Sequence, residues 1–246
     1  MPWRVNRTPY RVFVSEIMLQ QTSVARVLPR YAAFLRAFPS FRQLAGASIQ
    51  EVMSAWKGLG YNRRALALRQ SARQITSTFH GRLPRTVEEL VRLPGVGHAT
   101  ASAVIVYAFN IPLVFIETNV RRVFLHQYFP DQGSVPDSLV APLVEKTLDR
   151  KNPREWYYAL MDYGTSLSGG RQNPNRRSRG YKVQSRFEGS LRQLRGRILS
   201  VIIEKKSASR QQIEAELGAE PRLPQALGQL EEEGFLRFRG GRYSFR

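Results

Sequence analysis

The chain has 246 residues, of which 42% are hydrophobic, a size and composition that allow one large domain, or one domain and a smaller one, around a real core. Lysine and arginine number 38 against 19 aspartates and glutamates, a formal net charge of +19 that predicts a polyanionic partner, nucleic acid before an anionic membrane. The absence of cysteine excludes disulfides, thiolate zinc sites and Cys-ligated iron–sulfur clusters, and three widely spaced histidines disfavour a catalytic metal.

The sequence carries no signal for a membrane or for secretion. No apolar run approaches the ~18 residues that a membrane span needs. The first residues, MPWRVNRTPYRVF, lack the apolar segment of a signal peptide. We therefore expect a cytoplasmic, nucleoid-associated protein without membrane contact.

Helical periodicity dominates the first part of the chain, where apolar residues recur at spacings of three and four and proline or glycine marks the turns. This pattern predicts an all-α domain with at most one short strand, over 112–116. The predicted helices cover residues 10–21, 24–38, 49–60, 63–79, 86–93, 99–109, 118–129, 138–149 and 153–167.

The pattern breaks after the last of these helices. Residues 169–190 are rich in glycine and arginine and predict a basic linker between a domain over 1–168 and a smaller one over 191–246. The tail predicts helices over 194–205, 209–217 and 223–234, then two short strands around the Gly-Gly turn of 235–245.

Three helices followed by a β-hairpin are typical of a winged helix, whose third helix commonly enters a DNA groove. Here Glu231–Glu233 end that helix, which disfavours a deep groove fit. Arginines 237, 239, 242 and 246 on the hairpin favour contact with phosphates instead. A plain helical tail, or a dimerisation or packing module, is the alternative.

The stretch LPGVGHATASAV, residues 93–104, ends one helix, turns through Pro-Gly-Val-Gly and starts another. Glycine lets a second backbone approach closely, and the first amides of the new helix lack intrahelical partners. The segment therefore predicts a helix–hairpin–helix whose amides face a phosphate, independent of base sequence. An ordinary corner between two helices is the alternative interpretation.

Several further segments carry a specific resemblance. They are PYRVFVSEIMLQQTSVARVLPRY (9–31), WKGLGYNRRA (56–65), LVFIETNVRRVF (113–124) and ALMDYGTSL (159–167). Together with the hairpin they resemble, in order and spacing over about residues 2–168, the helix–hairpin–helix (HhH-GPD) DNA glycosylase superfamily, the endonuclease III and MutY group. The resemblance implies an all-α, two-lobed fold, followed here by a small winged-helix-like α+β domain.

The resemblance also implies chemistry. Base excision needs an acid for the departing base and a carboxylate for the oxocarbenium charge on the sugar. Glu16 matches the general acid of MutY-type proteins, and its apolar helical neighbours would raise its pKa. Glu117 stands where the superfamily places an aspartate, because the chain reads IETN in place of LDGN. The longer side chain predicts either the same role or a weakened or lost activity.

The same resemblance implies the contacts to DNA. Leu19, Gln20 and Gln21 match a segment that wedges into the duplex and fills the space of the flipped base, with helix packing by Leu19 as the alternative. Tyr61 matches an aromatic inserted beside the opposite base, and Asn62 replaces a second tyrosine that is frequent in the family. The expected hairpin contacts are Gly95, Val96, Gly97, His98, Ala99 and Thr100.

Two departures from the family are informative. Bifunctional members hold a lysine at the position of Ala99, where it attacks the sugar and cleaves the strand, whereas alanine carries no nucleophile. The family's cluster cysteines are absent, and Ser168 stands where the first would be. We expect a hydrogen-bonded basic loop with Arg176, Arg177 and Arg179 to replace the cluster and contact phosphates, a solvated linker being the alternative. No cofactor is expected, apart from the option of a monovalent cation at the hairpin.

These features predict a monomeric, monofunctional glycosylase that acts on double-stranded DNA and leaves an abasic site. Adenine opposite 8-oxoguanine or guanine is the expected substrate. Thymine or uracil opposite guanine is the first alternative, because related monofunctional enzymes act there. A catalytically silent, structure-specific DNA-binding protein is the second.

Overall fold

The computed structural model describes residues 1–169 and 173–246. Its first part is helical and contains α1 (Pro2–Val5), α2 (Pro9–Leu19), α3 (Val24–Ala37), α4 (Phe41–Gly46), α5 (Ile49–Trp56), α6 (Arg63–Thr78), α7 (Val87–Leu90), α8 (His98–Phe109), α9 (Thr118–Tyr128), α10 (Asp137–Thr147) and α11 (Pro153–Ser166). Two 3₁₀ turns follow, η1 (Leu167–Gly169) and η2 (Pro174–Arg177). The C-terminal part contains α12 (Leu191–Lys205), β1 (Ser207–Ala208), α13 (Arg210–Leu217), α14 (Leu223–Glu232), β2 (Leu236–Arg239) and β3 (Arg242–Phe245).

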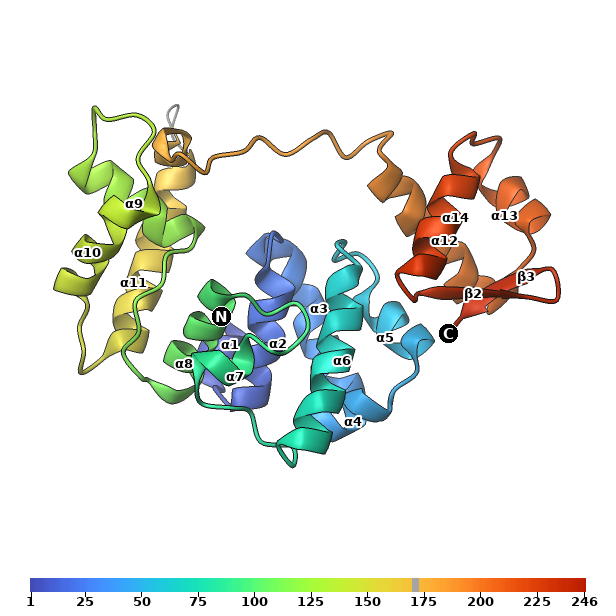
Figure 1. Ribbon diagram of the computed structural model, residues 1–246, viewed down its shortest axis with the longest axis horizontal. Coiled ribbons are helices and arrows are strands. Elements are labelled where there is room, and N and C mark those ends of the chain that lie inside the picture. Colours follow the sequence, from blue (N-terminus) through green and yellow to red (C-terminus); the bar gives the residue numbers. More distant parts are fainter. Residues whose placement is uncertain (170–172) are drawn as a thin grey trace.

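The helical part has two lobes with separate cores, which confirms the predicted fold class. In the first lobe, α2 to α8 surround a core rich in aromatic side chains, among them the fully buried Phe13, Phe34 and Trp56. In the second, α9, α10 and α11 enclose a smaller core with Phe124 and Tyr157. Figure 1 shows the α9–α11 lobe on one side of the central helices and the C-terminal unit on the other.

The C-terminal unit combines three helices with a three-stranded antiparallel sheet of order β1-β3-β2. The two strands predicted over 235–245 pair as expected, with Leu236 opposite Phe245 and Arg239 opposite Arg242. A third strand, β1, adds Ser207 opposite Ser244 and was missed because two residues carry no periodicity. The order of elements agrees with the winged-helix-like unit that the sequence predicts, while the three domain boundaries stay a prediction.

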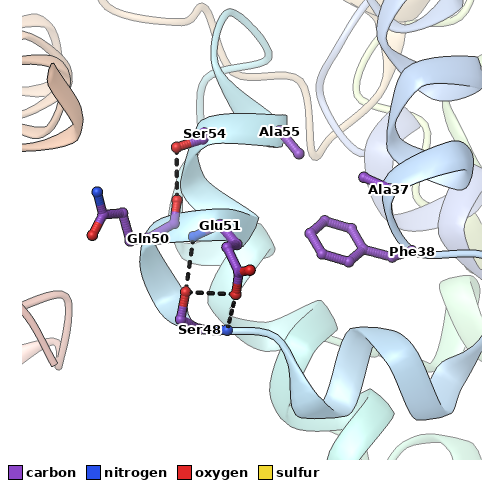
Figure 2. A pocket seen from close by; sticks show the side chains of 7 residues that line it. All are labelled: Ala37, Phe38, Ser48, Gln50, Glu51, Ser54 and Ala55. Atoms are coloured by element: carbon purple, nitrogen blue, oxygen red, sulfur yellow. Dashed lines mark hydrogen bonds between the residues drawn. The ribbon is translucent and has the colours of Figure 1, made fainter.

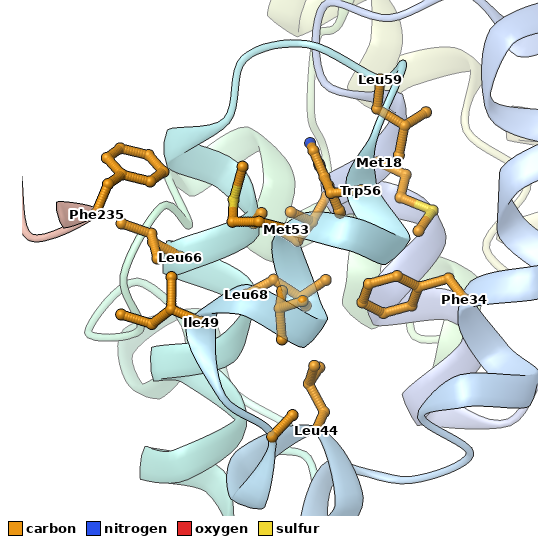
Figure 3. Close-up of a cluster of buried hydrophobic side chains, with 14 of the residues drawn as sticks. Met18, Phe34, Leu44, Ile49, Met53, Trp56, Leu59, Leu66, Leu68 and Phe235 are labelled. Carbon is orange, nitrogen blue, oxygen red and sulfur yellow. The ribbon is translucent and has the colours of Figure 1, made fainter. Parts of the chain in front are cut away.

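The C-terminal unit is docked on the first lobe. The side chain of Phe235 is fully buried within the core of that lobe and lies beside Leu66 (Figure 3). At the rim, Glu233 forms ion pairs with both Arg63 and Arg195. Burial of Glu233 opposes its ionisation, but the hydrogen bonds from both arginines hold its pKa below the ordinary value. The extended chain before α12 crosses over to reach this position (Figure 1).

Local sequence explains where most helices begin. Ser48 accepts a hydrogen bond from the amide of Glu51, whose carboxylate accepts one from the amide of Ser48 in return, a capping box that starts α5 (Figure 2). This cap borders a shallow hollow of about 700 Å³. Thr86 starts α7 in a similar way, by accepting a hydrogen bond from the amide of Glu89.

The predicted elements differ from the observed ones mainly at their ends. The helix predicted over 49–60 stops at Trp56, because Gly58 and Gly60 adopt positive φ angles of 92° and 71°. Residues 112–116 form no strand and run in extended form between α8 and α9. Part of the predicted linker, residues 170–172, lies outside the described residues. Across the described ranges, no helix is both long and apolar enough to cross a lipid bilayer.

The α9–α11 contact depends on Gly164, which generates our first testable prediction. A Cβ added to Gly164 would lie 2.6 Å from the backbone oxygen of Asn119, so the two helices must separate. We expect Gly164→Ala to lower the free energy of unfolding by about 2 kcal/mol, within the range for overpacked sites. Gly228→Ala in α14 is the matched control, since an added Cβ meets nothing within 4 Å there and alanine favours a helix. Urea unfolding of both variants measures the difference, and equal stabilities would contradict the close contact.

Candidate active site

A cleft of about 2330 Å³ lies where both lobes and the C-terminal unit meet. Its walls come from the end of α2, the turns before α3 and α6, the start of α8 and α9, and the inner faces of α11 and α12. Both candidate catalytic carboxylates, Glu16 and Glu117, line it. The cleft is large enough to admit a nucleotide extruded from a duplex.

Glu16 lies in the middle of α2, and its neighbours along the helix belong to the core. Val12 and Phe13, four and three residues before it respectively, are buried. No described residue donates a hydrogen bond to the Glu16 carboxylate. Burial, together with the nearby charge of Glu117, raises its pKa to about 8, and Arg4 only partly offsets this shift. Glu16 is therefore protonated at neutral pH and can donate that proton into the cleft.

Glu117 stands in a different environment, at the N-terminus of α9. Its Oε1 accepts hydrogen bonds from the amides of Asn119, at 2.6 Å, and Val120, at 3.1 Å, so the side chain caps its own helix. Burial raises the pKa of Glu117, and these amide hydrogen bonds counteract the rise. Unpaired amides and the positive end of the helix dipole favour the ionised carboxylate. The two carboxylates of the cleft thus differ in the hydrogen bonds that they accept from the protein.

A group that sequence reasoning missed lies beside Glu16. The guanidinium of Arg4 donates to both carboxylate oxygens of Asp162, at 2.7 and 2.9 Å, and lies over the ring of Tyr158, 4.5 Å from its centroid. Tyr107 stacks on Tyr158 with ring centroids 4.9 Å apart, and its buried hydroxyl has no hydrogen-bond partner among the described residues. Arg4 belongs to the short first helix and Asp162 to α11 in the second lobe, so only the tertiary structure brings them together.

The hairpin turn is formed as predicted and is tied to the end of α2. Gly95 has φ +75°, and an added Cβ would lie 2.8 Å from the Cβ of Ala67. Gly97 is the N-cap of α8, which leaves the first amides of that helix unpaired. Gln20 donates from Nε2 to the Gly95 oxygen, at 3.1 Å, and to Thr100 Oγ1, at 3.2 Å. Gln20 therefore positions the turn as well as lining the cleft.

The remaining predicted hairpin residues are arranged around this turn. Val96 is buried and packs into the core, whereas His98 and Ala99 are exposed. Ala99 and Thr100 line the cleft. A contact of the turn with DNA stays a prediction.

The two loops predicted to wedge into DNA both border the cleft. Gln21 and Tyr61 both line it, and both have positive φ angles, 51° and 46°, which cost energy for residues other than glycine. Leu19 lines the cleft and also packs against the core, so helix packing is observed, while its insertion into DNA stays a prediction. Asn62 follows Tyr61 and lies at the N-terminus of α6.

The buried guanidinium of Arg64 joins these two loops. Nη1 donates to the backbone oxygens of Met18, at 2.7 Å, and of Gln20, while Nη2 donates to Thr22 Oγ1 at 2.8 Å and to the Gly60 oxygen at 3.1 Å. Burial lowers the pKa of Arg64 to about 10, so it stays charged at neutral pH. Sequence reasoning missed this residue because an arginine inside a basic chain looks like a surface charge.

The loop that replaces the cysteines is hydrogen-bonded, and it supports α9. The buried Asn175 donates to the Thr118 oxygen at 3.1 Å, next to Glu117. Arg122 donates to Asn119 Oδ1 at 2.7 Å and to the Gly164 oxygen at 2.6 Å. The guanidinium of Arg177 donates to the backbone oxygens of Pro130 and Leu125.

Arg177 is thus engaged within the protein, whereas Arg176 and Arg179 retain accessible side chains. A contact of these three arginines with DNA phosphates stays a prediction. Ser168 lines the cleft and donates to the Thr165 oxygen. Across residues 1–169 and 173–246, no three His, Cys, Asp or Glu side chains gather in a way that could hold a metal ion.

The fold and the site together define a class. A two-lobed helical protein with a hairpin turn beside two partly buried carboxylates is built like a DNA base-excision protein. The model of the HhH-GPD superfamily of base excision DNA repair proteins matches residues 14–144, more than half of the chain. The chain belongs to this superfamily, as the sequence motifs predicted.

Curated relatives agree with this assignment. The adenine DNA glycosylase of Mycolicibacterium smegmatis is 35% identical over 82% of this chain and 75% of its own length. Those of Buchnera aphidicola (subspecies Baizongia pistaciae) and Homo sapiens are 32% and 35% identical over 68% of this chain, but over only 48% and 33% of their own lengths. The chain spans half or less of several of the curated relatives it matches.

Solved structures show the same fold. A thermostable thymine-DNA glycosylase is 26% identical, with a TM-score of 0.61 over 71% of this chain and 82% of its own. An endonuclease III trapped as a covalent intermediate with DNA has a TM-score of 0.59 over 68% of this chain and 79% of its own, at 20% identity.

Replacing Arg64 tests its role in joining the two loops. In Arg64→Ala the backbone oxygen of Met18 and the hydroxyl of Thr22 lose the guanidinium donor in a buried setting, and we expect a loss of about 3 kcal/mol in the free energy of unfolding. Arg36→Ala removes an exposed arginine of α3 and serves as the control, with an expected change below about 0.5 kcal/mol. Chemical denaturation measures both. A loss in Arg64→Ala no larger than in the control would contradict the assigned role.

Proposed function

We propose that the protein is a monofunctional DNA glycosylase that removes adenine opposite 8-oxoguanine or guanine and leaves an abasic site. One observation carries the chemical part of the proposal: two carboxylates share one cleft but differ in their hydrogen bonds. No described residue donates a hydrogen bond to Glu16, whereas Glu117 accepts hydrogen bonds from two backbone amides. The choice of base rests on the similarity to proteins named adenine DNA glycosylase.

The proposed reaction divides the work between these two groups. Glu16 gives its proton to a ring nitrogen of the base as the C1′–N bond breaks, and the electron pair of that bond leaves with the base. The sugar is left as an oxocarbenium ion. Glu117 stabilises this charge and takes the proton of the water that adds to C1′. Both amides bind Oε1 of Glu117, which leaves Oε2 for the sugar and the water.

The proposed enzyme does not cleave the strand. Ala99 holds the position at which a strand-cleaving relative carries its lysine. Lys57 is the only lysine among the described residues that line the cleft, and its Nζ is paired with Glu204 at 3.1 Å. No lysine side chain among the described residues is therefore placed to attack C1′ beside Glu16 and Glu117.

Two other functions compete with this one. Similarity to a solved thymine-DNA glycosylase favours thymine or uracil opposite guanine as the first alternative. The second is a silent DNA-binding protein, in which the longer Glu117 caps its helix and performs no catalysis. We further propose that the enzyme acts as a monomer on duplex DNA in the nucleoid, without an iron–sulfur cluster, for which the chain offers no cysteine.

A panel of duplexes tests these proposals against one another. The protein is incubated with adenine opposite 8-oxoguanine, adenine opposite guanine, thymine opposite guanine and uracil opposite guanine. Each sample is then divided, and one half is heated in alkali, which breaks DNA at abasic sites. We expect breaks on the adenine duplexes, and only after alkali. Breaks without alkali would overturn the monofunctional assignment, and tight binding without any excision would support the silent binder.

The raised pKa of Glu16 predicts the pH dependence. The protonated form is the acid, so single-turnover excision should fall about tenfold per pH unit above the pKa of about 8. Glu117 must be ionised and burial raises its pKa, so excision should also fall at acid pH. Glu16→Gln keeps the shape of the side chain but carries no acidic proton, so excision should be lost while DNA binding is retained. A rate that stays constant through pH 9, or an active Glu16→Gln variant, would remove Glu16 from the proposed role.

A further inference from the structure

The β-hairpin of β2 and β3 gathers three arginines on one face. Residues that lie directly opposite each other on paired strands share a face, and so do alternate residues of one strand. Arg237 is opposite Ser244, and Arg239 is opposite Arg242. The serine hydroxyls of Ser207 and Ser244 complete this surface. We call these five residues the wing face.

The wing face is unfavourable for an isolated protein. Arg239 and Arg242 are a like-charged pair directly across two strands, an arrangement that destabilises a sheet. Arg237 donates to Ser244 Oγ at 3.3 Å and Arg242 to Ser207 Oγ at 3.1 Å, both neutral partners. No ion pair between described residues includes any arginine of the wing face. The positive charge is therefore left uncompensated by the fold, as it is where an anion binds.

The other candidate surface of the same unit does not suit an anion. The exposed residues of α14 include Pro224 and Gln225, and its last residues are acidic. The end of this helix is docked on the first lobe through Glu233. The end of the third helix is thus engaged with the first lobe, whereas the wing face carries arginines without an ion pair among the described residues.

The wing face also lies outside the cleft. None of its five residues lines the cleft, although residues of α12 and α14 do. The buried Phe235 immediately precedes β2, which holds the hairpin in a fixed position on the protein (Figures 1 and 3). A polyanion bound there must be an additional segment beyond the one that the cleft accepts.

We propose that the wing face binds the phosphates of duplex DNA that flanks the segment held in the cleft. The spaced guanidiniums and hydroxyls suit backbone contacts, which hold a protein on DNA without reading its sequence. Such contacts release counterions, so they appear in the salt dependence of binding. The proposal concerns affinity for undamaged DNA, and it stands or fails independently of base excision.

The test compares Arg239→Ala/Arg242→Ala with the parent chain on an undamaged long duplex that extends past the cleft on both sides. Loss of two phosphate contacts should weaken binding tenfold or more, at roughly 0.1 M salt, and lower the slope of log affinity against log salt by roughly 2 in magnitude. The thermal midpoint should stay equal or rise, because a like-charge pair is removed. On a short duplex that fills only the cleft, affinity should be unchanged.

Lys205→Ala/Arg210→Ala is the charge-matched control. It removes two positive charges from the same unit, but both are already paired, with Glu216 and Glu214. We expect a smaller change in the salt slope than for the wing variant. Equal slopes for the two variants, or an equal loss on short and long duplexes, would each overturn the proposal. Weakened binding to anionic vesicles with DNA affinity intact would overturn it too, in favour of a membrane.

Discussion

The structure depends on placing two carboxylates in one cleft while giving each a different hydrogen-bonding environment. Glu16 comes from the apolar interior of α2, and Glu117 from the polar start of α9, which belongs to the other lobe. Burial keeps a proton on the first, and helix amides stabilise the charge of the second. Each environment would be ordinary alone. Their juxtaposition requires two lobes packed so that a helix interior faces a helix end.

The support of α9 follows from this requirement. Gly164 brings α11 into contact with Asn119, and Arg122 ties both helices together through hydrogen bonds. The loop at Asn175 fixes the backbone beside Glu117. The chain contains no cysteine. Hydrogen bonds from Asn175 and Arg122 hold the start of α9 in place, in the region where the sequence resemblance implied a cluster. The arginines of the chain accordingly fall into two groups. Buried ones such as Arg64 and Arg122 bind backbone oxygens, whereas exposed ones such as Arg176 and Arg179 keep their side chains accessible.

The C-terminal unit is docked on the first lobe and also carries exposed arginines. Its core merges with that of the first lobe through Phe235, and Glu233 links Arg63 to Arg195 at the edge of the cleft. The unit therefore forms a wall of the cleft through α12, while the arginines of the wing face lie outside the cleft. A tethered DNA-binding module would have kept its third helix exposed. Docking of that helix explains why its acidic end is tolerated.

The sequence by itself determined the helices and the hairpin turn, because periodicity and glycine act over a few residues. Local motifs also singled out Glu16, Glu117 and Ala99 as candidate site residues. It also indicated the basic loop and the strands of 235–245. The tertiary structure decided what depends on distant contacts: the pairing of Arg4 with Asp162, the joining of two loops by Arg64, and the docking of the C-terminal unit. An arginine reads as a surface charge in a sequence, and only the folded chain shows which carbonyl oxygens surround it.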